Sequence, residues 1–142
     1  MYCTLTDIEK ELPAAKVIEL TDDENAGAVN TGRVTEATAK ADSLIDAYCA
    51  GRYTVPFAAP PQIVKTLSVS LSIYNLYKRR GRISDTLQEQ YKNDLRLLES
   101  ISKGTITLGV AQPSAASPVD AAEVADVDDT GRTFSQETLG NF

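Results

Sequence analysis

The stretch from Pro61 to Arg82, PQIVKTLSVSLSIYNLYKRRGR, most constrains the fold because it predicts one long amphipathic helix. Apolar side chains recur there at intervals of four, four and three residues, which places them on one helical face: Ile63, Leu67, Leu71 and Tyr74. Ile73, Leu76 and Tyr77 widen that face beyond a single stripe. A helix of this length forms a rod of roughly 30 Å. Because its wide apolar face needs neighbours on several sides, we expect it at the centre of a helical bundle.

Helix start and stop signals recur along the rest of the first 110 residues. Pro13 breaks a first helical run, and Gly51 and Gly104 can end two longer ones. The expected helices are Asp7 to Leu12 with Thr6 as its cap, Ala14 to Leu20, Gly32 to Ala50 after Asn30 or Thr31, and Asp85 to Ser102 after Ser84. The pattern predicts an all-α fold: a small antiparallel bundle of about four helices with one short β-run and a flexible C-terminal arm.

The segment from Thr105 to Val110, TITLGV, is the one short β-prone run. No hairpin partner lies beside it in the sequence. A lone strand in a helical domain must borrow a sheet edge, so we expect pairing with another subunit. Ile106 and Leu108 are therefore candidate docking residues.

Two irregular connections separate the helices. The loop from Thr21 to Gly32, TDDENAGAVNTG, is acidic, but it lacks a calcium ligand at Ala26 and the closing Glu at Arg33. A solvated acidic turn is the interpretation that this pattern favours. The connector from Arg52 to Pro60 alternates Tyr53, Val55 and Phe57, which predicts an extended segment tucked against the core.

The composition argues against most catalytic and metal chemistry. The chain has no His, which removes the commonest general base, and its two cysteines, Cys3 and Cys49, are too few for a zinc site. We expect both cysteines to be small buried residues, although a disulfide between them stays open. No enzyme activity, metal or cofactor is expected. Asp42 and Asp46, one turn apart, are the remaining acid–base alternative, and their place beside the apolar stripe predicts that they face solvent.

The net charge of −6 belongs to the end of the chain. Residues 111–142 carry six acids and one base, Arg132, whereas the first 110 residues carry 13 bases and 14 acids. This shift predicts three parts: a helical domain at 1–110, an acidic flexible linker at 111–131 and a docking segment at 132–142. The docking residues of that last segment are Phe134, Leu139 and Phe142. No apolar run approaches about 18 residues, so we expect a soluble protein made in a cytoplasm and no membrane partner.

The densest basic patch lies at the end of the long helix: Lys78, Arg79, Arg80 and Arg82. Phosphate contact is one interpretation of this cluster, because Lys and Arg beside nucleic acid release counterions. The other is a helix C-terminus that complements its own dipole. Contact with a neighbouring subunit is a third, and the sequence alone does not choose among them.

In order and spacing, the chain resembles the head–tail joining proteins of Mu-like phages and prophages, which are related to the wider class of connector adaptors or head-completion proteins. Five segments carry this resemblance: YCTLTDIEKELP, ELTDDENAGAVNTGRV, ATAKADSLIDAYCAGRYTVPF, PPQIVKTLSVSLSIYNLYKRRG and ISKGTITLG. The final FSQETLGNF also resembles the chain end of the family, whereas residues 111–131 carry no resemblance.

The resemblance implies a virion structural protein with a small antiparallel helical bundle and no catalytic residues. Such adaptors form a ring with copies of themselves, twelve-fold in the virion, beneath the portal protein, and they provide the surface to which tail-side neck proteins attach. The expected location is the virion neck, with the host cytoplasm during assembly, and packaged DNA is a non-specific partner. The alternative function is a small helical DNA-binding or regulatory module that uses the cluster from Lys78 to Arg82.

Overall fold

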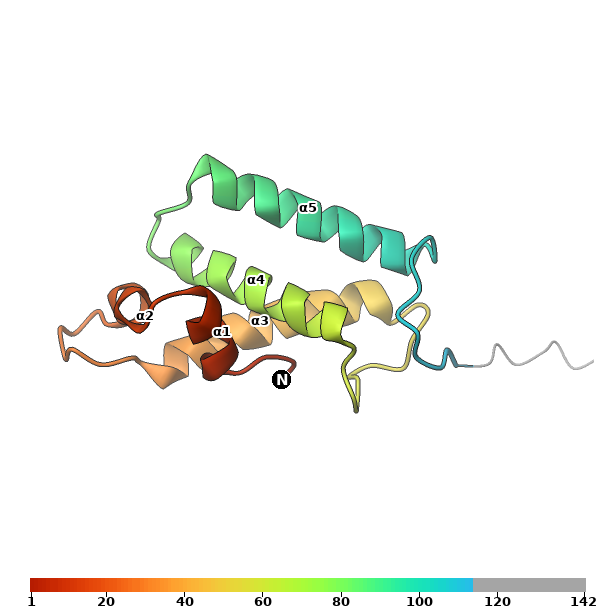
Figure 1. Cartoon of the computed structure of the whole chain (residues 1–142), viewed down its shortest axis with the longest axis horizontal. Helices are drawn as coiled ribbons and strands as arrows, with labels where there is room; N and C mark the ends of the chain where they lie inside the picture. The colour runs from red at the N-terminus through yellow and green to blue at the C-terminus, as the bar shows by residue number, and fades with distance from the viewer. Residues whose placement is uncertain (114–142) are drawn as a thin grey trace, which may run out of the picture.

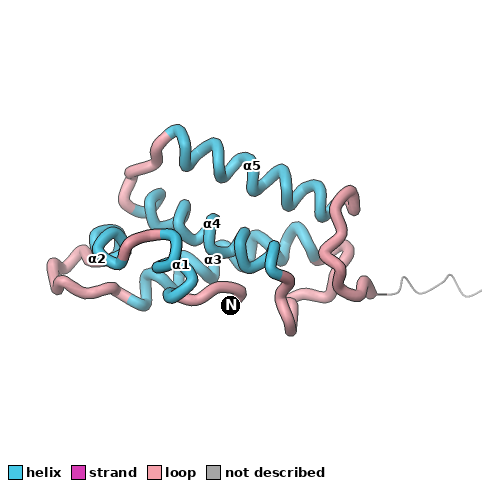
Figure 2. Tube along the Cα trace, in the orientation of Figure 1, coloured by secondary structure: helices cyan, strands magenta, loops and turns pink. Residues whose placement is uncertain are grey.

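A computed structural model describes residues 1–113 of the chain, which form five α-helices and no strand (Figures 1 and 2). The helices are α1 (Leu5–Glu11), α2 (Ala14–Thr21), α3 (Thr31–Cys49), α4 (Gln62–Arg79) and α5 (Asp85–Ser102). The three long helices follow one another in alternating direction, and α1 and α2 pack as two short segments against α3 and α4 (Figure 1). The expected antiparallel helical bundle is confirmed, with five helices in place of about four.

The central helix is α4, which contacts each of the other four helices. One side of α4 contributes Val64, Leu67 and Leu71 to a core shared with α3, α5 and the N-terminal segment. Another side places Val69 and Ile73 against α1 and α2. Two apolar faces on one helix therefore join the long helices to the short pair, as the wide stripe predicted.

The start of α1 differs from the prediction, whereas the end of α4 agrees with it. Helix α1 begins after Thr4 and not after Thr6: the Thr4 hydroxyl accepts from the Asp7 N–H, and the Asp7 carboxylate accepts from the Thr4 N–H at 3.0 Å. The Thr4 hydrogen bonds, with Lys10 nearby, lower the pKa of Asp7 to about 2. Helix α4 ends at Arg79, and Gly81 turns the chain with a φ of +65°, so the prediction that the basic residues close this helix and Gly81 terminates it is confirmed.

The predicted β-run is wrong, because residues 105–110 form no strand. Its apolar side chains still alternate as expected, but they face the core of their own chain. Leu108 is buried, and its N–H donates to the Tyr53 hydroxyl at 3.1 Å. The Ile106 N–H donates to the Ser100 carbonyl at 3.2 Å, so the segment closes onto α5 and the connector instead of a partner's sheet edge.

Other buried positions agree with the prediction. Tyr53 is buried in the connector, and Phe57 packs with its ring centroid 6.0 Å from that of Tyr53. Cys3 and Cys49 are both buried and free, and burial raises the pKa of the Cys49 thiol to about 11. None of the five helices is long and apolar enough to cross a membrane.

Candidate functional site

The basic cluster at the end of α4 contacts the loop that follows α2. Both Nη atoms of Arg79 contact the Asp23 carboxylate, at 2.7 and 3.0 Å, in a two-point ion pair. Arg80 contacts the same carboxylate at 2.8 Å, and Arg82 pairs with Glu19. Three members of the predicted cluster thus bind acids of their own chain.

Asp23 is the centre of this network, since Arg33 of α3 also reaches it at 2.9 Å. A hydrogen bond from Arg79 and the three nearby guanidinium groups hold the pKa of Asp23 below its ordinary value. Arg80 also donates to the carbonyl oxygens of Glu19 and Asp22, at 2.9 and 2.7 Å. The acidic loop is therefore held across the ends of α3 and α4, and residues 23–28 are exposed, which agrees with the prediction of a solvated acidic turn.

Asp22 shapes the same loop from within. Its carboxylate accepts from the N–H groups of Ala26 and Gly27 at 3.0 and 2.7 Å, which lowers its pKa. Among residues 1–113, no three Cys, Asp or Glu side chains are placed to share a metal ion. The loop acids act as acceptors for backbone and guanidinium donors.

Lys78 differs from the other members of the cluster. Its side chain is exposed and makes no ion pair or hydrogen bond within the described part of the chain. It lines a hollow of about 370 Å³ between α3 and α4, together with Arg33, Lys40 and the acid Glu36, which pairs with Lys40 at 2.7 Å. The sequence did not indicate this grouping, because Arg33 and Lys40 lie on a different helix. Phosphate contact by the cluster stays a prediction, and this hollow is its best location.

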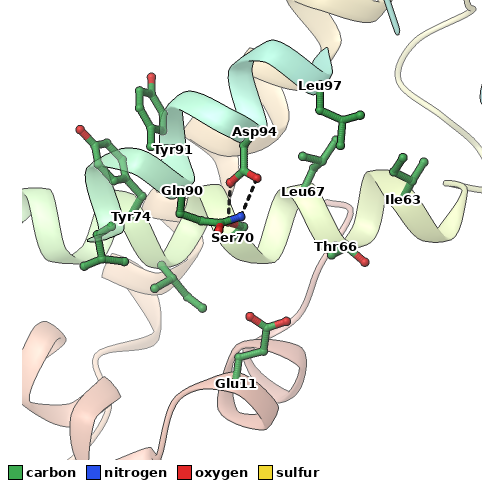
Figure 3. Close-up of a pocket in the computed structure, with 12 residues that line it drawn as sticks. Glu11, Ile63, Thr66, Leu67, Ser70, Tyr74, Gln90, Tyr91, Asp94 and Leu97 are labelled. Atoms are coloured by element: carbon green, nitrogen blue, oxygen red, sulfur yellow. Dashed lines mark hydrogen bonds between the residues drawn. The ribbon is translucent and has the colours of Figure 1, made fainter. Parts of the chain in front are cut away.

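A larger groove lies between α4 and α5, with a volume of about 550 Å³ (Figure 3). Glu11 of α1 lies at its edge. The lining residues are mostly apolar or uncharged: Ile63, Thr66, Leu67, Ser70, Ile73, Tyr74, Leu87, Gln90, Tyr91 and Leu97, together with the acids Glu11 and Asp94. No Lys or Arg lines it. Large apolar side chains that are only half buried make this groove a candidate binding surface.

Asp94 lies inside the groove and is 7% exposed. Its carboxylate accepts from the Ser70 hydroxyl and from the Gln90 amide at 3.0 Å (Figure 3). Burial raises its pKa, and the two hydrogen bonds oppose that shift. The sequence held a signal for this residue, because Leu87, Tyr91, Asp94 and Leu98 follow the spacing of one buried helical face.

The rings of Tyr74 and Tyr91 stack across the groove, with centroids 4.0 Å apart and planes inclined by 9°. This pair joins α4 to α5 and forms one wall of the groove. Each ring keeps an exposed portion, so the wall presents aromatic surface to a ligand.

The prediction that Asp42 and Asp46 face solvent is wrong. Asp42 is 9% exposed, and its carboxylate accepts from the Tyr2 N–H at 2.9 Å and the Ser68 hydroxyl at 2.6 Å. Asp46 is half buried and accepts from the Tyr2 hydroxyl, which itself accepts from the Phe57 N–H at 3.0 Å. Burial and the Asp46 hydrogen bond raise the pKa of Tyr2. The two acids hold the N-terminal segment against α3, α4 and the connector.

The predicted docking residues fall into two groups. Leu108 is buried in the core of its own chain and Ile106 is half buried against it, and docking by these residues stays a prediction. Phe134, Leu139 and Phe142 lie outside the described residues, as do the 132–142 segment and most of the acidic linker.

Comparison with known proteins gives one family and two relatives. Residues 2–126 match the family described as "Bacteriophage Mu, Gp36". The chain is 26% identical to "Mu-like prophage FluMu protein gp36" of Haemophilus influenzae over 82% of its own length and 80% of the relative. It is 25% identical to "Gene product J" of Escherichia phage Mu over 98% of its length and 97% of the relative. Since the family match extends over most of the sequence, the chain belongs to the Bacteriophage Mu Gp36 family.

Proposed function

We propose that this chain is a structural protein of a phage particle that acts as a head–tail connector adaptor. It assembles as a ring beneath the portal protein and provides the surface to which the tail attaches. The observation that carries this proposal is the alignment with a phage Mu protein over nearly the full length of both chains. The family match over residues 2–126 supports the same assignment.

The helical body suits such a role because the α4–α5 groove offers an open apolar surface for protein contact. The α4–α5 groove presents half-buried apolar side chains on two rigid helices, with two acids among them. Many copies in a ring would multiply a weak contact at each subunit into firm attachment.

Complementation of phage heads tests the proposal. A phage deleted for this gene is expected to give DNA-filled heads without tails, and addition of the purified protein should restore tail joining, counted by negative-stain electron microscopy. Leu97→Asp, which places a charge in the groove, should reduce rescue, whereas Thr35→Asp on the exposed side of α3 should not. Deletion particles that carry normal tails would contradict the proposed function.

A DNA-binding or regulatory module is the second candidate, and the hollow lined by Lys78, Lys40 and Arg33 is the observation that favours it. Affinity for duplex DNA should then fall steeply between about 50 and 200 mM salt. The double variant Lys40→Ala/Lys78→Ala should lose most of the affinity, whereas Lys65→Ala/Lys92→Ala removes the same charge elsewhere and should retain it. Absence of binding at about 50 mM salt would eliminate this candidate.

A further inference from the structure

The α4–α5 groove is only partly filled by its own walls. Five large apolar side chains line it and are half buried: Ile63, Tyr74, Leu87, Tyr91 and Leu97. A cavity of about 550 Å³ has room for several side chains of a peptide. Because its charged lining residues are the acids Glu11 and Asp94, it favours an apolar ligand that carries a positive charge.

The described chain ends beside the connector, at one end of the bundle, where Val110 and Ala111 line a separate hollow. Val110 packs against the same core cluster as Ile63 and Leu97, which line one end of the groove. In Figure 1 the chain leaves the bundle at the end where α5 finishes and α4 begins. Residues that follow Pro113 therefore start at the same end of the bundle as Ile63 and Leu97, and the tether must pass from the connector to reach the groove.

The remaining sequence carries a matching ligand. Arg132 is the single base after residue 110, and Phe134 follows two positions later, with Leu139 and Phe142 beyond it. Residues 114–131 span at most about 60 Å, which exceeds the roughly 27 Å length of α5. A covalent tether of this length gives an effective concentration in the millimolar range, so even a weak contact would be populated within one molecule.

Positive charge on α5 also suits residues 114–131, the acidic segment that connects the described chain to Arg132. Lys92 and Arg96 are exposed on α5 and make no ion pair within residues 1–113. The connecting segment carries five acids and no base: Asp120, Glu123, Asp126, Asp128 and Asp129. These acids can pass beside α5 with favourable Coulomb energy, although salt screens such exposed contacts.

We propose that residues 132–142 bind in the α4–α5 groove of the same chain, with Arg132 directed at Glu11 and Asp94 and Phe134 against the apolar wall. The segment then covers the groove in the free protein, and any partner that uses the groove must displace it. This inference does not depend on the proposed function in the phage particle.

Cysteine trapping tests the contact in the full chain. The test pair is Thr66→Cys in the groove with Thr133→Cys in the terminal segment. The control pair replaces the first with Thr35→Cys, because Thr35 and Thr66 are both exposed helical threonines whose hydroxyls bond the carbonyl four residues earlier. The native cysteines, Cys3 and Cys49, are buried and remain in both proteins.

At low micromolar concentration, mild oxidation should form the intramolecular disulfide at least about tenfold faster in the test pair, as measured by mass spectrometry and gel mobility. Equal rates in the two pairs would overturn the proposal. Disulfide-linked dimers as the main product would also overturn it, because they would assign the groove to a second copy.

Two substitutions in the terminal segment check specificity in the same test protein. Phe134→Ser and Arg132→Glu should each lower the trapping rate toward that of the control pair, whereas Ser135→Ala should leave it unchanged. Circular dichroism spectra verify that every variant keeps its helical content. If neither substitution slows trapping, the contact is non-specific and the proposal fails.

Discussion

The buried carboxylate of Asp42 gives the sharpest prediction for stability. It accepts from the Tyr2 N–H at 2.9 Å and from the Ser68 hydroxyl at 2.6 Å, and both donors are buried. Asp42→Ala leaves these donors without that acceptor, at a cost of about 1–3 kcal/mol each. Because the Ser68 hydroxyl also lies 3.2 Å from the Cys3 sulfur, its loss is partly compensated. We therefore expect the free energy of unfolding to fall by about 3 kcal/mol.

Urea unfolding followed by circular dichroism measures this loss. With an m value of about 2 kcal/mol per molar urea, the midpoint should fall by about 1.5 M. Asp42→Asn keeps one acceptor oxygen and most of the side-chain volume, so it should lose about half as much.

An exposed acid on the same helix provides the matched control. Glu36 pairs only with Lys40 within the described residues, at 2.7 Å, and Glu36→Ala should leave the midpoint nearly unchanged. A loss below about 1 kcal/mol for Asp42→Ala would refute the reasoning, because it would mean that both donors find other partners or water.

Three further predictions follow from individual contacts. Leu108→Ala should lower the free energy of unfolding by about 2–3 kcal/mol, whereas the exposed neighbour Thr107→Ala should have little effect in the same urea titration. Asp23→Asn should lower the melting temperature more at low salt than at high salt, because salt screens exposed ion pairs. The difference in melting temperature between the wild-type protein and this variant should vanish as the pH falls through the lowered pKa of Asp23. The pKa of Asp94 is raised, so its contribution to stability depends on pH in the opposite direction to that of Asp23. The contribution of protonated Asp94 is fully present below the unfolded-state pKa and is lost as the pH rises through the folded-state pKa. Asp94→Asn should therefore flatten the dependence of the unfolding free energy on pH above about pH 4.

Helix boundaries could be predicted where a local signal is unique. Ser84 caps α5 as expected, and its side chain accepts from the Leu87 N–H at 3.3 Å. For the first helix the expected cap is Thr6, but the structure uses Thr4, whose side chain and backbone both bond Asp7. The cap that the structure uses is the one that forms a reciprocal capping box with the residue three positions later.

The partners of charged and β-prone segments could not be predicted, because they depend on contacts between distant residues. Asp23 and Arg79 are 56 residues apart, so no local pattern joins the acidic loop to the basic cluster. Asp42 lies among polar positions of α3, and its burial follows from Tyr2 and Ser68 on other segments. The run around Leu108 showed the alternation of a strand, but extended geometry alone does not require a sheet.

These long-range contacts change which surface of residues 1–113 can serve a partner. Arg79, Arg80 and Arg82 are held by acids of their own chain, and a phosphate would have to displace the two-point contact between Arg79 and Asp23. Of the predicted docking residues, Leu108 is buried in the core and Ile106 is half buried against it. The α4–α5 groove, in contrast, keeps half-buried apolar walls and an acid without a cation within the described chain. Binding there removes apolar surface from water without breaking an ion pair between residues 1–113, so among the surfaces of these residues the groove favours association most.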